Sequence, residues 1–293
     1  MSPQTKTLVH RLRMLKQIKG WVRGYLGPEP STLKTYALPY KKEFTGRWRP
    51  SETDELFDEL KKAEIVYGGD FHGFAQAQRT HLRVLRSLSS RKKVILALEV
   101  FETRHQRLLN HFLAGKMGET EFLSKIHWEK NWGFPWEHYR PLLELARRRG
   151  WQVVALNRHI TRKSAETLKT RDRHAAKQLV SVLLRNPGSI TYVVFGDLHI
   201  AGAHLPKWVD RDLGRPARSV FLFQNSERLY FTLARKGQEA AVHLLRRGNR
   251  FCVLSSPPWV KWQSYLMFLE NSLDRDLLEE IGEIDLTAYI RQS

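Results

Sequence analysis

The sequence predicts an α/β fold in which a mainly parallel sheet is flanked by helices. Four short apolar runs of strand composition lead to polar residues; the runs are residues 65–67, 94–98, 152–156 and 190–195. Segments with apolar side chains at helical spacing, such as residues 74–88 and 142–146, lie between the runs. Strands and helices that alternate in this way form parallel sheets through right-handed crossovers. We therefore expect the four runs to be parallel neighbours in one sheet.

Residues 1–26 predict a basic amphipathic helix, because apolar side chains recur at three- and four-residue spacing and basic residues fill much of the rest. Such a helix can lie on an anionic membrane or dock on a partner. Alternatively, it packs its apolar stripe on its own domain and leaves its Arg and Lys side chains solvated. Residues 27–50, with Pro and Gly among aromatics and lysines, predict an extended arm. We expect the N-terminal helix and arm, residues 1–50, to be dispensable for the central site.

The expected α/β domain spans residues 51–235. It begins with Ser51-Glu52-Thr53-Asp54, which predicts a helix start because a hydroxyl cap is followed by an acid three residues on. Further along, a tryptophan-rich insert from Trp128 to Trp136 precedes a helix that opens near Glu137. A long helix is expected from about 162 to 186.

The C-terminal part predicts a β-hairpin and a helical extension. Residues 220–223 and 229–233 are strand-like runs on either side of a short polar turn, which is the pattern of a hairpin at a sheet edge. Residues 236–293 predict a mostly helical extension packed on the same domain, interrupted by the strand-like run 251–254 and by Pro257-Pro258. No clear second domain is expected.

The composition fits one folded domain with additions. At 293 residues with 42% hydrophobic residues, the chain can bury a core without cross-links. Its single cysteine, Cys252, excludes disulfides within the chain, a Cys-based zinc cluster and the N-terminal cysteine of a lipoprotein signal. No uninterrupted apolar segment suits a secretory signal or a transmembrane span. We therefore expect a cytoplasmic protein. Residues 1–26 leave open an additional peripheral association with the inner membrane surface.

The formal net charge of +19 is large and calls for an explanation. An anionic membrane surface bound by residues 1–26 is one candidate partner. Nucleic acid is another, since Lys and Arg bind phosphates. However, no zinc-finger spacing, RNP-type aromatic pattern or Gly-x-x-Gly loop accompanies the charge, so we do not expect nucleic-acid binding.

One tetrapeptide pattern, Gly-Asp-x-His, occurs twice, and each copy follows a predicted strand. The copies are Gly69-Asp70-Phe71-His72 and Gly196-Asp197-Leu198-His199. Glu99 and Asn157 follow the other two predicted strands. Because ligands bind at the carboxyl ends of the strands in such sheets, these residues predict one site. In particular, we expect His72, Glu99 and His199 to converge within roughly 10 Å, since neighbouring strands lie about 4.8 Å apart.

Several blocks of the sequence resemble the ChaN family of haem-binding proteins. The blocks are Tyr67–His72, Leu96–Phe101 with Gln106, Phe112–Lys116, Trp128, Trp132–Phe134, Tyr139–Leu142, Val153–Asn157, Arg171-Asp172 and Gly196–His199. They span roughly residues 62–205 in the family's order and spacing, and leave residues 1–50 and 240–293 outside. The ChaN-like proteins form a wider superfamily with the TIKI metalloproteases, the TraB/PrgY proteins and the erythromycin esterases.

The resemblance implies an α/β core in which two Gly-x-x-His motifs and a strand-end Glu face one cleft. Here those positions are His72, His199 and Glu99, and Asp70 stands where the family usually has Glu. The resemblance also implies haem or iron binding. A haem site needs an apolar slot, an axial ligand and cations for the propionates. The candidate cofactor-binding residues are Tyr139, Arg140, Arg171 and Asn157, and His72 and His199 are further candidate axial ligands.

A metal-dependent hydrolase, either a peptidase or an esterase, is the first alternative. His72, His199, Glu99 and Asp197 supply a mixed nitrogen and oxygen ligand set that suits zinc, manganese or iron. A metal-bound water could then attack an amide or ester, with His72, Glu99, His199 and Asp70 as the catalytic residues. The second alternative is a non-enzymatic basic protein that binds a membrane surface or a partner. The sequence leaves open whether the chain forms a homodimer.

Overall fold

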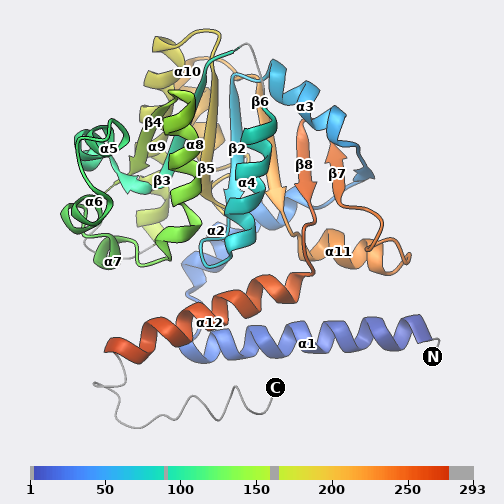
Figure 1. Cartoon of the computed structure of the whole chain (residues 1–293). Helices are drawn as coiled ribbons and strands as arrows, with labels where there is room; N and C mark the ends of the chain where they lie inside the picture. The colour runs from blue at the N-terminus through green and yellow to red at the C-terminus, as the bar shows by residue number, and fades with distance from the viewer. Residues whose placement is uncertain (1–2, 89–91, 159–164, 277–293) are drawn as a thin grey trace.

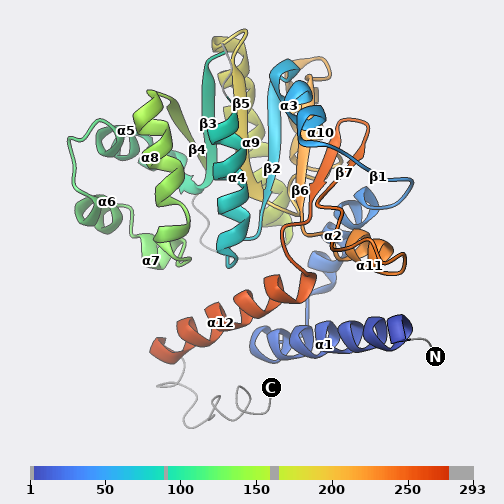
Figure 2. The same ribbon diagram turned by 45° about the vertical axis from the view of Figure 1, so that its right-hand side comes forward.

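A computed structural model of the protein describes residues 3–88, 92–158 and 165–276. These residues form a central sheet with helices on both faces (Figure 1). Two long helices, α1 (Pro3–Leu26) and α12 (Pro258–Asp276), lie side by side across the ends of the strands. Figure 2 shows the same pair as a separate layer at the carboxyl ends of the parallel strands. This layer therefore lies at the end of the sheet where the sequence predicts a site.

The described part of the sheet has eight strands, and those from β8 to the edge strand β4 run parallel to one another. In spatial order the strands are β1 (Arg49–Pro50), β7 (Leu244–Arg247), β8 (Arg250–Val253), β6 (Ser219–Gln224), β2 (Ile65–Asp70), β5 (Ile190–Gly196), β3 (Val94–Glu102) and β4 (Gln152–Asn157). The four strands expected from the sequence are neighbours, since β2 pairs with β5, β5 with β3, and β3 with β4, always parallel. The predicted α/β fold class and the predicted parallel pairing are both confirmed.

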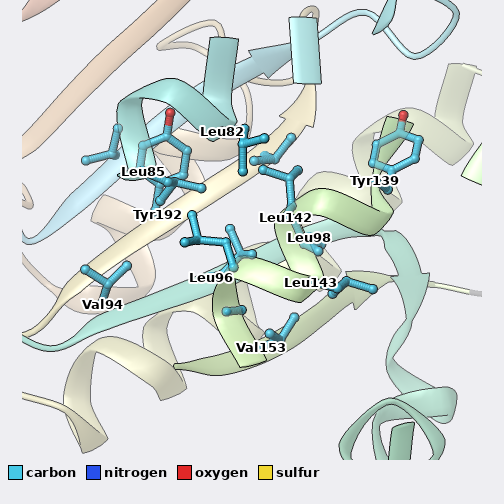
Figure 3. Packing of buried hydrophobic residues seen from close by; sticks show 14 of the residues in the cluster. Leu82, Leu85, Val94, Leu96, Leu98, Tyr139, Leu142, Leu143, Val153 and Tyr192 are labelled. Carbon is cyan, nitrogen blue, oxygen red and sulfur yellow. The ribbon is translucent and has the colours of Figure 1, made fainter. Parts of the chain in front are cut away.

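Helices pack on both faces of the sheet through apolar side chains. On one face, Leu82 and Leu142 lie in one cluster with Leu96 and Leu98 of β3 (Figure 3). The helices of this face include α3 (Thr53–Lys62), α4 (Ala75–Ser87) and α8 (Arg140–Arg149). The helices of the other face include α2 (Ser31–Glu43), α9 (Ala165–Arg185) and α10 (Leu205–Leu213). Because both faces are covered, the central strands are buried along their whole length, and their apolar residues run continuously instead of alternating with polar ones.

Between β3 and β4, short helices surround a group of aromatic side chains. The helices are η1 (Thr103–His105), α5 (Gln106–Leu113), α6 (Glu119–Lys125), α7 (Trp128–Asn131) and η2 (Trp136–His138). Phe112 stacks on Phe122 with ring centroids 4.6 Å apart, and Trp128 meets Trp136 edge to face at 5.1 Å. Phe122, Trp128 and Trp136 are buried. Most of the aromatic insert thus closes part of the core.

The predicted N-terminal helix is present as α1, and its apolar stripe packs on the protein itself. Leu15, Ile18 and Val22 are buried, and the clusters that contain Leu15 and Val22 also include side chains of α12 and of α11 (Glu227–Ala234). This is the second of the two arrangements considered for the helix. Its outer face is basic and exposed, and includes Arg13, Lys16 and Arg23.

Among the described residues, no helix combines the length and the apolar character that crossing a bilayer requires.

The prediction of an extended arm over residues 27–50 is wrong for residues 31–43, which form α2. Pro39 lies inside this helix, although an interior proline lacks an N–H donor and normally ends a helix. Tyr36 and Ala37 are buried on the protein, so tertiary packing holds the helix against its local preference. The Pro and Gly content of the segment was therefore a misleading signal.

The C-terminal β-hairpin exists, but not where it was predicted. Residues 220–223 belong to β6, which lies between the parallel strands β2 and β8, whereas residues 229–233 lie in α11. Ser226 caps that helix, because its Oγ accepts a hydrogen bond from the first turn over 3.5 Å. The hairpin is formed by β7 and β8 instead. The predicted helical extension contributes these two strands as well as α12, and residues 277–293 lie outside the described residues.

Candidate active site

The carboxyl ends of β2, β3 and β5 bring His72, Glu99 and His199 to one point beside Gly196. A Cβ atom built on Gly196 would lie 3.3 Å from both His72 Nε2 and Glu99 Oε2, and 3.5 Å from His199 Cδ2. His72 Nε2 itself lies 3.6 Å from Glu99 Oε2. The three side chains therefore converge, and the glycine leaves the space between them free of a side chain. Their chemical roles remain predictions.

Asp70 and Tyr139 contact Nδ1 of the His72 ring. Nε2 therefore remains available at the point beside Gly196. His72 Nδ1 lies 2.9 Å from Asp70 Oδ2. The Tyr139 hydroxyl donates to the same oxygen over 3.0 Å and lies 3.3 Å from His72 Nδ1. An ionised carboxylate only accepts hydrogen bonds, so the proton of the neutral imidazole lies on Nδ1 and Nε2 keeps a lone pair. Asp70 also accepts a hydrogen bond from Gln78.

The pKa values in this group follow from burial and from neighbouring charges. Burial lowers the pKa of His72, but Asp70 and then Glu99 outweigh this effect, so the pKa lies above its ordinary value. Burial raises the pKa of Asp70, but His72 outweighs it, and the pKa lies below its ordinary value. Burial and the Asp70 carboxylate hold the pKa of Tyr139 well above its usual range. The phenol therefore stays a donor, while the two carboxylates favour the protonated form of the imidazole.

His199 is held in the same way by Asp172 and Tyr36, which sequence reasoning did not identify as site residues. His199 Nδ1 lies 2.6 Å from Asp172 Oδ1. The Tyr36 hydroxyl donates to Asp172 Oδ2 over 2.6 Å and lies 2.8 Å from His199 Nδ1. Asp172 stands in one of the blocks that resemble the ChaN family, and that signal could have identified it. Tyr36 lies outside those blocks, in the segment predicted as an extended arm.

Glu99 lies 3.6 Å from His72 Nε2 and is fixed by donors on both of its oxygens. The Gly196 backbone N–H donates to Glu99 Oε2 over 2.5 Å. Arg171 donates to Glu99 Oε1, and its Nε donates to Asn157 Oδ1 over 3.1 Å. Arg171 and Asn157, which were predicted to bind a cofactor, are therefore brought to the centre, where their hydrogen bonds hold Glu99.

The loop that follows β2 and carries His72 is covered by α12. Ser264 Oγ donates to the Gly73 carbonyl over 2.6 Å. The Tyr265 ring lies against Gly73, where a Cβ atom would come within 2.8 Å of it. The His72 ring also contacts two aromatic rings of the insert, with centroid distances of 4.6 Å to Trp132 and 5.2 Å to Phe134. The C-terminal helix and the insert thus enclose the imidazole between them.

The carboxylate of Asp197, a predicted metal ligand, lies against Gly69 of the neighbouring strand. It is buried near Tyr40 of α2, and its Oδ1 has no hydrogen-bond partner within the described residues. Burial raises the pKa of Asp197 to about 6, against the opposing effect of Lys261.

Arg140, a predicted propionate partner, does not join the centre. Its guanidinium is exposed and lies 3.6 Å from both Glu119 and Glu144. It lines a separate cavity of about 480 Å³ between α5, α6 and α8. Tyr139, the preceding residue, points instead to Asp70.

The side chains present do not form the predicted metal site. Within residues 3–88, 92–158 and 165–276, no group of three His, Cys, Asp or Glu side chains is arranged to hold a metal ion. Glu99 is occupied by Arg171 and Gly196, and Asp197 lies beneath Gly69. The predicted divalent metal therefore has no support from the arrangement of its candidate ligands.

The centre also does not fit haem. The Tyr139 phenol is fully buried and donates to Asp70, so it is not an available axial ligand. His72 Nε2 faces Glu99 at 3.6 Å, and this distance leaves no room for a porphyrin ring between the two side chains. His72 is therefore not placed to bind a haem iron at this point.

Residues 56–168 match the model of a family described as "Haem-binding uptake, Tiki superfamily, ChaN". The matched segment contains Asp70, His72, Glu99 and Tyr139. Residues 56–168 are thus ChaN-like, and the resemblance predicted from the sequence is confirmed over this segment. Among curated proteins, none matches this chain.

Solved structures with a similar fold include a haem-binding protein and bacterial effectors. ChaN of Campylobacter jejuni, solved as "Cofacial heme binding", is 12% identical, with a TM-score of 0.47 over 61% of this chain and 88% of its own. The type III effector HopBA1 is 14% identical, with a TM-score of 0.47 over 72% of this chain and 97% of its own. The RRSP effector domain of a Vibrio vulnificus MARTX toxin is 20% identical, with a TM-score of 0.35 over 66% and 40%. At these values the likenesses carry no argument about function.

Proposed function

We propose that the protein is a hydrolase of amide or ester bonds, with His72 as its acid–base residue. The proposal rests on the 3.6 Å separation of His72 Nε2 from Glu99 Oε2, beside a glycine that has no side chain to separate the two groups. An imidazole with a fixed Nδ1 and a free Nε2 is arranged to take a proton from water. The pKa of His72 lies above its ordinary value because of the Asp70 and Glu99 carboxylates, and this favours the protonated imidazole that donates in the reverse direction.

In the proposed reaction, His72 Nε2 takes a proton from water as the water oxygen bonds to the carbonyl carbon of the substrate. Asp70 and Glu99 contact the two sides of the resulting imidazolium and stabilise its charge. The carbonyl then re-forms as the C–N or C–O bond breaks, and the proton passes to the leaving nitrogen or oxygen. His199, beside the same glycine, is a second imidazole whose Nε2 lone pair relays that proton from His72 to the leaving group.

The test is turnover of chromogenic esters and of a quenched fluorescent peptide library by the purified protein. His72→Ala should lower kcat/KM by about 10²–10⁴-fold, the usual contribution of a positioned acid–base residue. His111→Ala, on the outer helix α5, is the matched control and should retain the parent rate. Absence of turnover with every ester and amide would contradict the proposal. Turnover that appears only with added zinc or manganese would favour the metal-dependent alternative.

Haem binding is the second candidate function, and the family match over residues 56–168 is the observation that favours it. Because the centre does not fit haem, we expect any haem to bind outside it. The measurement is a titration with haemin followed by the Soret band. A band of equal strength in His72→Ala and in the parent would place haem outside the centre, whereas loss of the band would show that His72 is a ligand.

A further inference from the structure

We propose that Tyr36 is a positioning residue that sets the tautomer of His199 and makes α2 part of the active site. The Tyr36 side chain is buried, and its hydroxyl contacts both partners of the second histidine group. Tyr36 Oη lies 2.6 Å from Asp172 Oδ2 and 2.8 Å from His199 Nδ1. The inference rests on the proposed function only for the part that His199 plays in turnover.

The hydrogen bonds among these three side chains allow one consistent arrangement of protons. Burial and the Asp172 carboxylate hold the pKa of Tyr36 far above its ordinary value, so the phenol keeps its proton and donates it to Asp172 Oδ2. His199 Nδ1, at 2.6 Å from Asp172 Oδ1, then carries a proton that points to the carboxylate and to the phenol oxygen. His199 Nε2 is consequently the basic nitrogen of the neutral ring.

Tyr36 is itself fixed by His204, which follows His199 on the same loop. The two rings stack with centroids 4.0 Å apart and an interplanar angle of 13°. The Tyr36 backbone carbonyl also lies 2.8 Å from His204 Nε2, within hydrogen-bonding distance. The position of the phenol is therefore set by two contacts that are independent of Asp172.

The arrangement repeats the one at the first histidine. Tyr139 lies against Asp70 and His72 as Tyr36 lies against Asp172 and His199, with one phenol, one carboxylate and one imidazole Nδ1 in each group. Tyr139 precedes α8, whereas Tyr36 comes from α2 on the opposite face of the sheet. Two unrelated segments thus supply the same chemical group, which indicates that both imidazoles need a fixed Nδ1 proton.

The experiment compares Tyr36→Phe with Tyr192→Phe in the full chain. Phe at position 36 keeps the ring that stacks on His204 and removes only the hydroxyl. Tyr192→Phe is the matched control, because its buried hydroxyl lies 3.0 Å from a nitrogen of another histidine, His81. The readouts are histidine side-chain ¹⁵N NMR and the pH dependence of turnover.

In the parent protein we expect His199 nitrogen shifts of an Nδ1–H tautomer. In Tyr36→Phe, Asp172 Oδ2 loses the donor that holds the carboxylate against His199. We therefore expect a mixture of tautomers, a shifted pH profile and a kcat lowered about tenfold with little change in KM, as for loss of one hydrogen bond to a charged group. Tyr192→Phe should leave the His199 signals and the pH profile unchanged.

Two results would overturn the proposal. One is an Nε2–H tautomer of His199 in the parent protein. This measurement needs no variant, so it remains decisive even if Tyr36→Phe fails to fold. The other is a folded Tyr36→Phe protein with parent-like His199 shifts. Neither readout of the tautomer requires turnover, so failure of the hydrolase proposal and failure of this one are distinguishable.

Discussion

His72 Nε2 and Glu99 Oε2 face each other at 3.6 Å across the carboxyl ends of two different strands. The distance is longer than a direct hydrogen bond and short enough for one small polar atom of a substrate or water to contact both. Each group is held from its other side, His72 by Asp70 and Glu99 by Arg171. Chemistry at this site is therefore expected to depend on both side chains and on the open space between them.

The first prediction concerns that open space. Gly196→Ala would place a Cβ atom within 3.3 Å of His72 Nε2 and Glu99 Oε2, so we expect turnover to fall at least tenfold while thermal stability changes little. Gly118→Ala is the matched control, because a Cβ there meets nothing within 4 Å. The measurement is kcat/KM with the best ester or peptide, beside Tm. Parent-like turnover in Gly196→Ala would show that the reacting groups do not meet at this glycine.

The second prediction is the pH dependence of stability from the His72–Asp70 pair. The folded-state pKa of His72 is raised, so its contribution is complete below its unfolded pKa of about 6.5 and is lost as the pH rises through the folded pKa. The folded-state pKa of Asp70 is lowered, so its contribution is present above about 3.9 and is lost as the pH falls further. We expect His72→Gln to cost more stability at pH 5.5 than at pH 8.5. Urea unfolding of both proteins at the two pH values tests this, and an equal cost at both would contradict it.

The third prediction concerns the buried carboxyl of Asp197. Its pKa is raised to about 6, so its protonated form favours folding at low pH and its charge opposes folding above pH 6. Asp197→Asn keeps the shape and removes that charge. We expect the variant to be more stable than the parent by about 1–3 kcal/mol at pH 8 and about equal at pH 4. Urea unfolding at both pH values is the measurement, and destabilisation at pH 8 would show that the charge is needed by Lys261 or Tyr40.

The fourth prediction separates two parts of the N-terminal region. Deleting residues 1–28 removes α1 and leaves α2, whereas deleting residues 1–50 also removes Tyr36 and Tyr40. We expect the shorter deletion to keep turnover and the longer one to abolish it, because Tyr36 contacts Asp172 and His199. Circular dichroism of both proteins checks folding. Full activity after the longer deletion would restore the expectation that the whole region is dispensable.

The fifth prediction addresses the basic outer face of α1. If this face binds an anionic membrane, binding to vesicles with 30% (mol) phosphatidylserine should fall several-fold when Arg13, Lys16 and Arg23 are replaced by Gln, and should fall with added salt. A variant with the same charge change elsewhere, Arg83, Arg148 and Arg149 to Gln, is the control. Equal vesicle binding by both variants would show that the overall charge, and not this helix, is responsible.

The parts of the fold that local patterns specify were predictable, and those set by tertiary packing were not. The central strands are buried on both faces, so their apolar runs and the polar residues after them are visible in the sequence. The helix at residues 31–43 was missed because Pro39 interrupts its helical pattern in the sequence. The helix forms nevertheless, because the burial of Tyr36 stabilises it. The run at 229–233 was misread because a short apolar segment has no period that separates a strand from a helix; here the Ser226 cap marks the helix.

The same distinction holds in the site. His72, Glu99 and His199 follow strands, and parallel strands bring their carboxyl ends together, so their convergence follows from topology. Asp197 has the same sequence context as Asp70 but lies beneath Gly69, since its orientation depends on the side-chain packing of the neighbouring strand. Arg140 follows Tyr139 directly and faces a different cavity, which no sequence pattern specifies.

The covering of the His72 loop by α12 has a consequence for the order of folding. Gly73 contacts Ser264 and Tyr265, which are synthesised nearly two hundred residues later. Contacts of such long sequence separation form late, because the intervening chain must be ordered first. A nascent chain that has completed the whole parallel sheet would still have a loose His72 loop. The reactive centre is therefore assembled among the last parts of the molecule, and incomplete translation products are expected to be folded in part and catalytically silent.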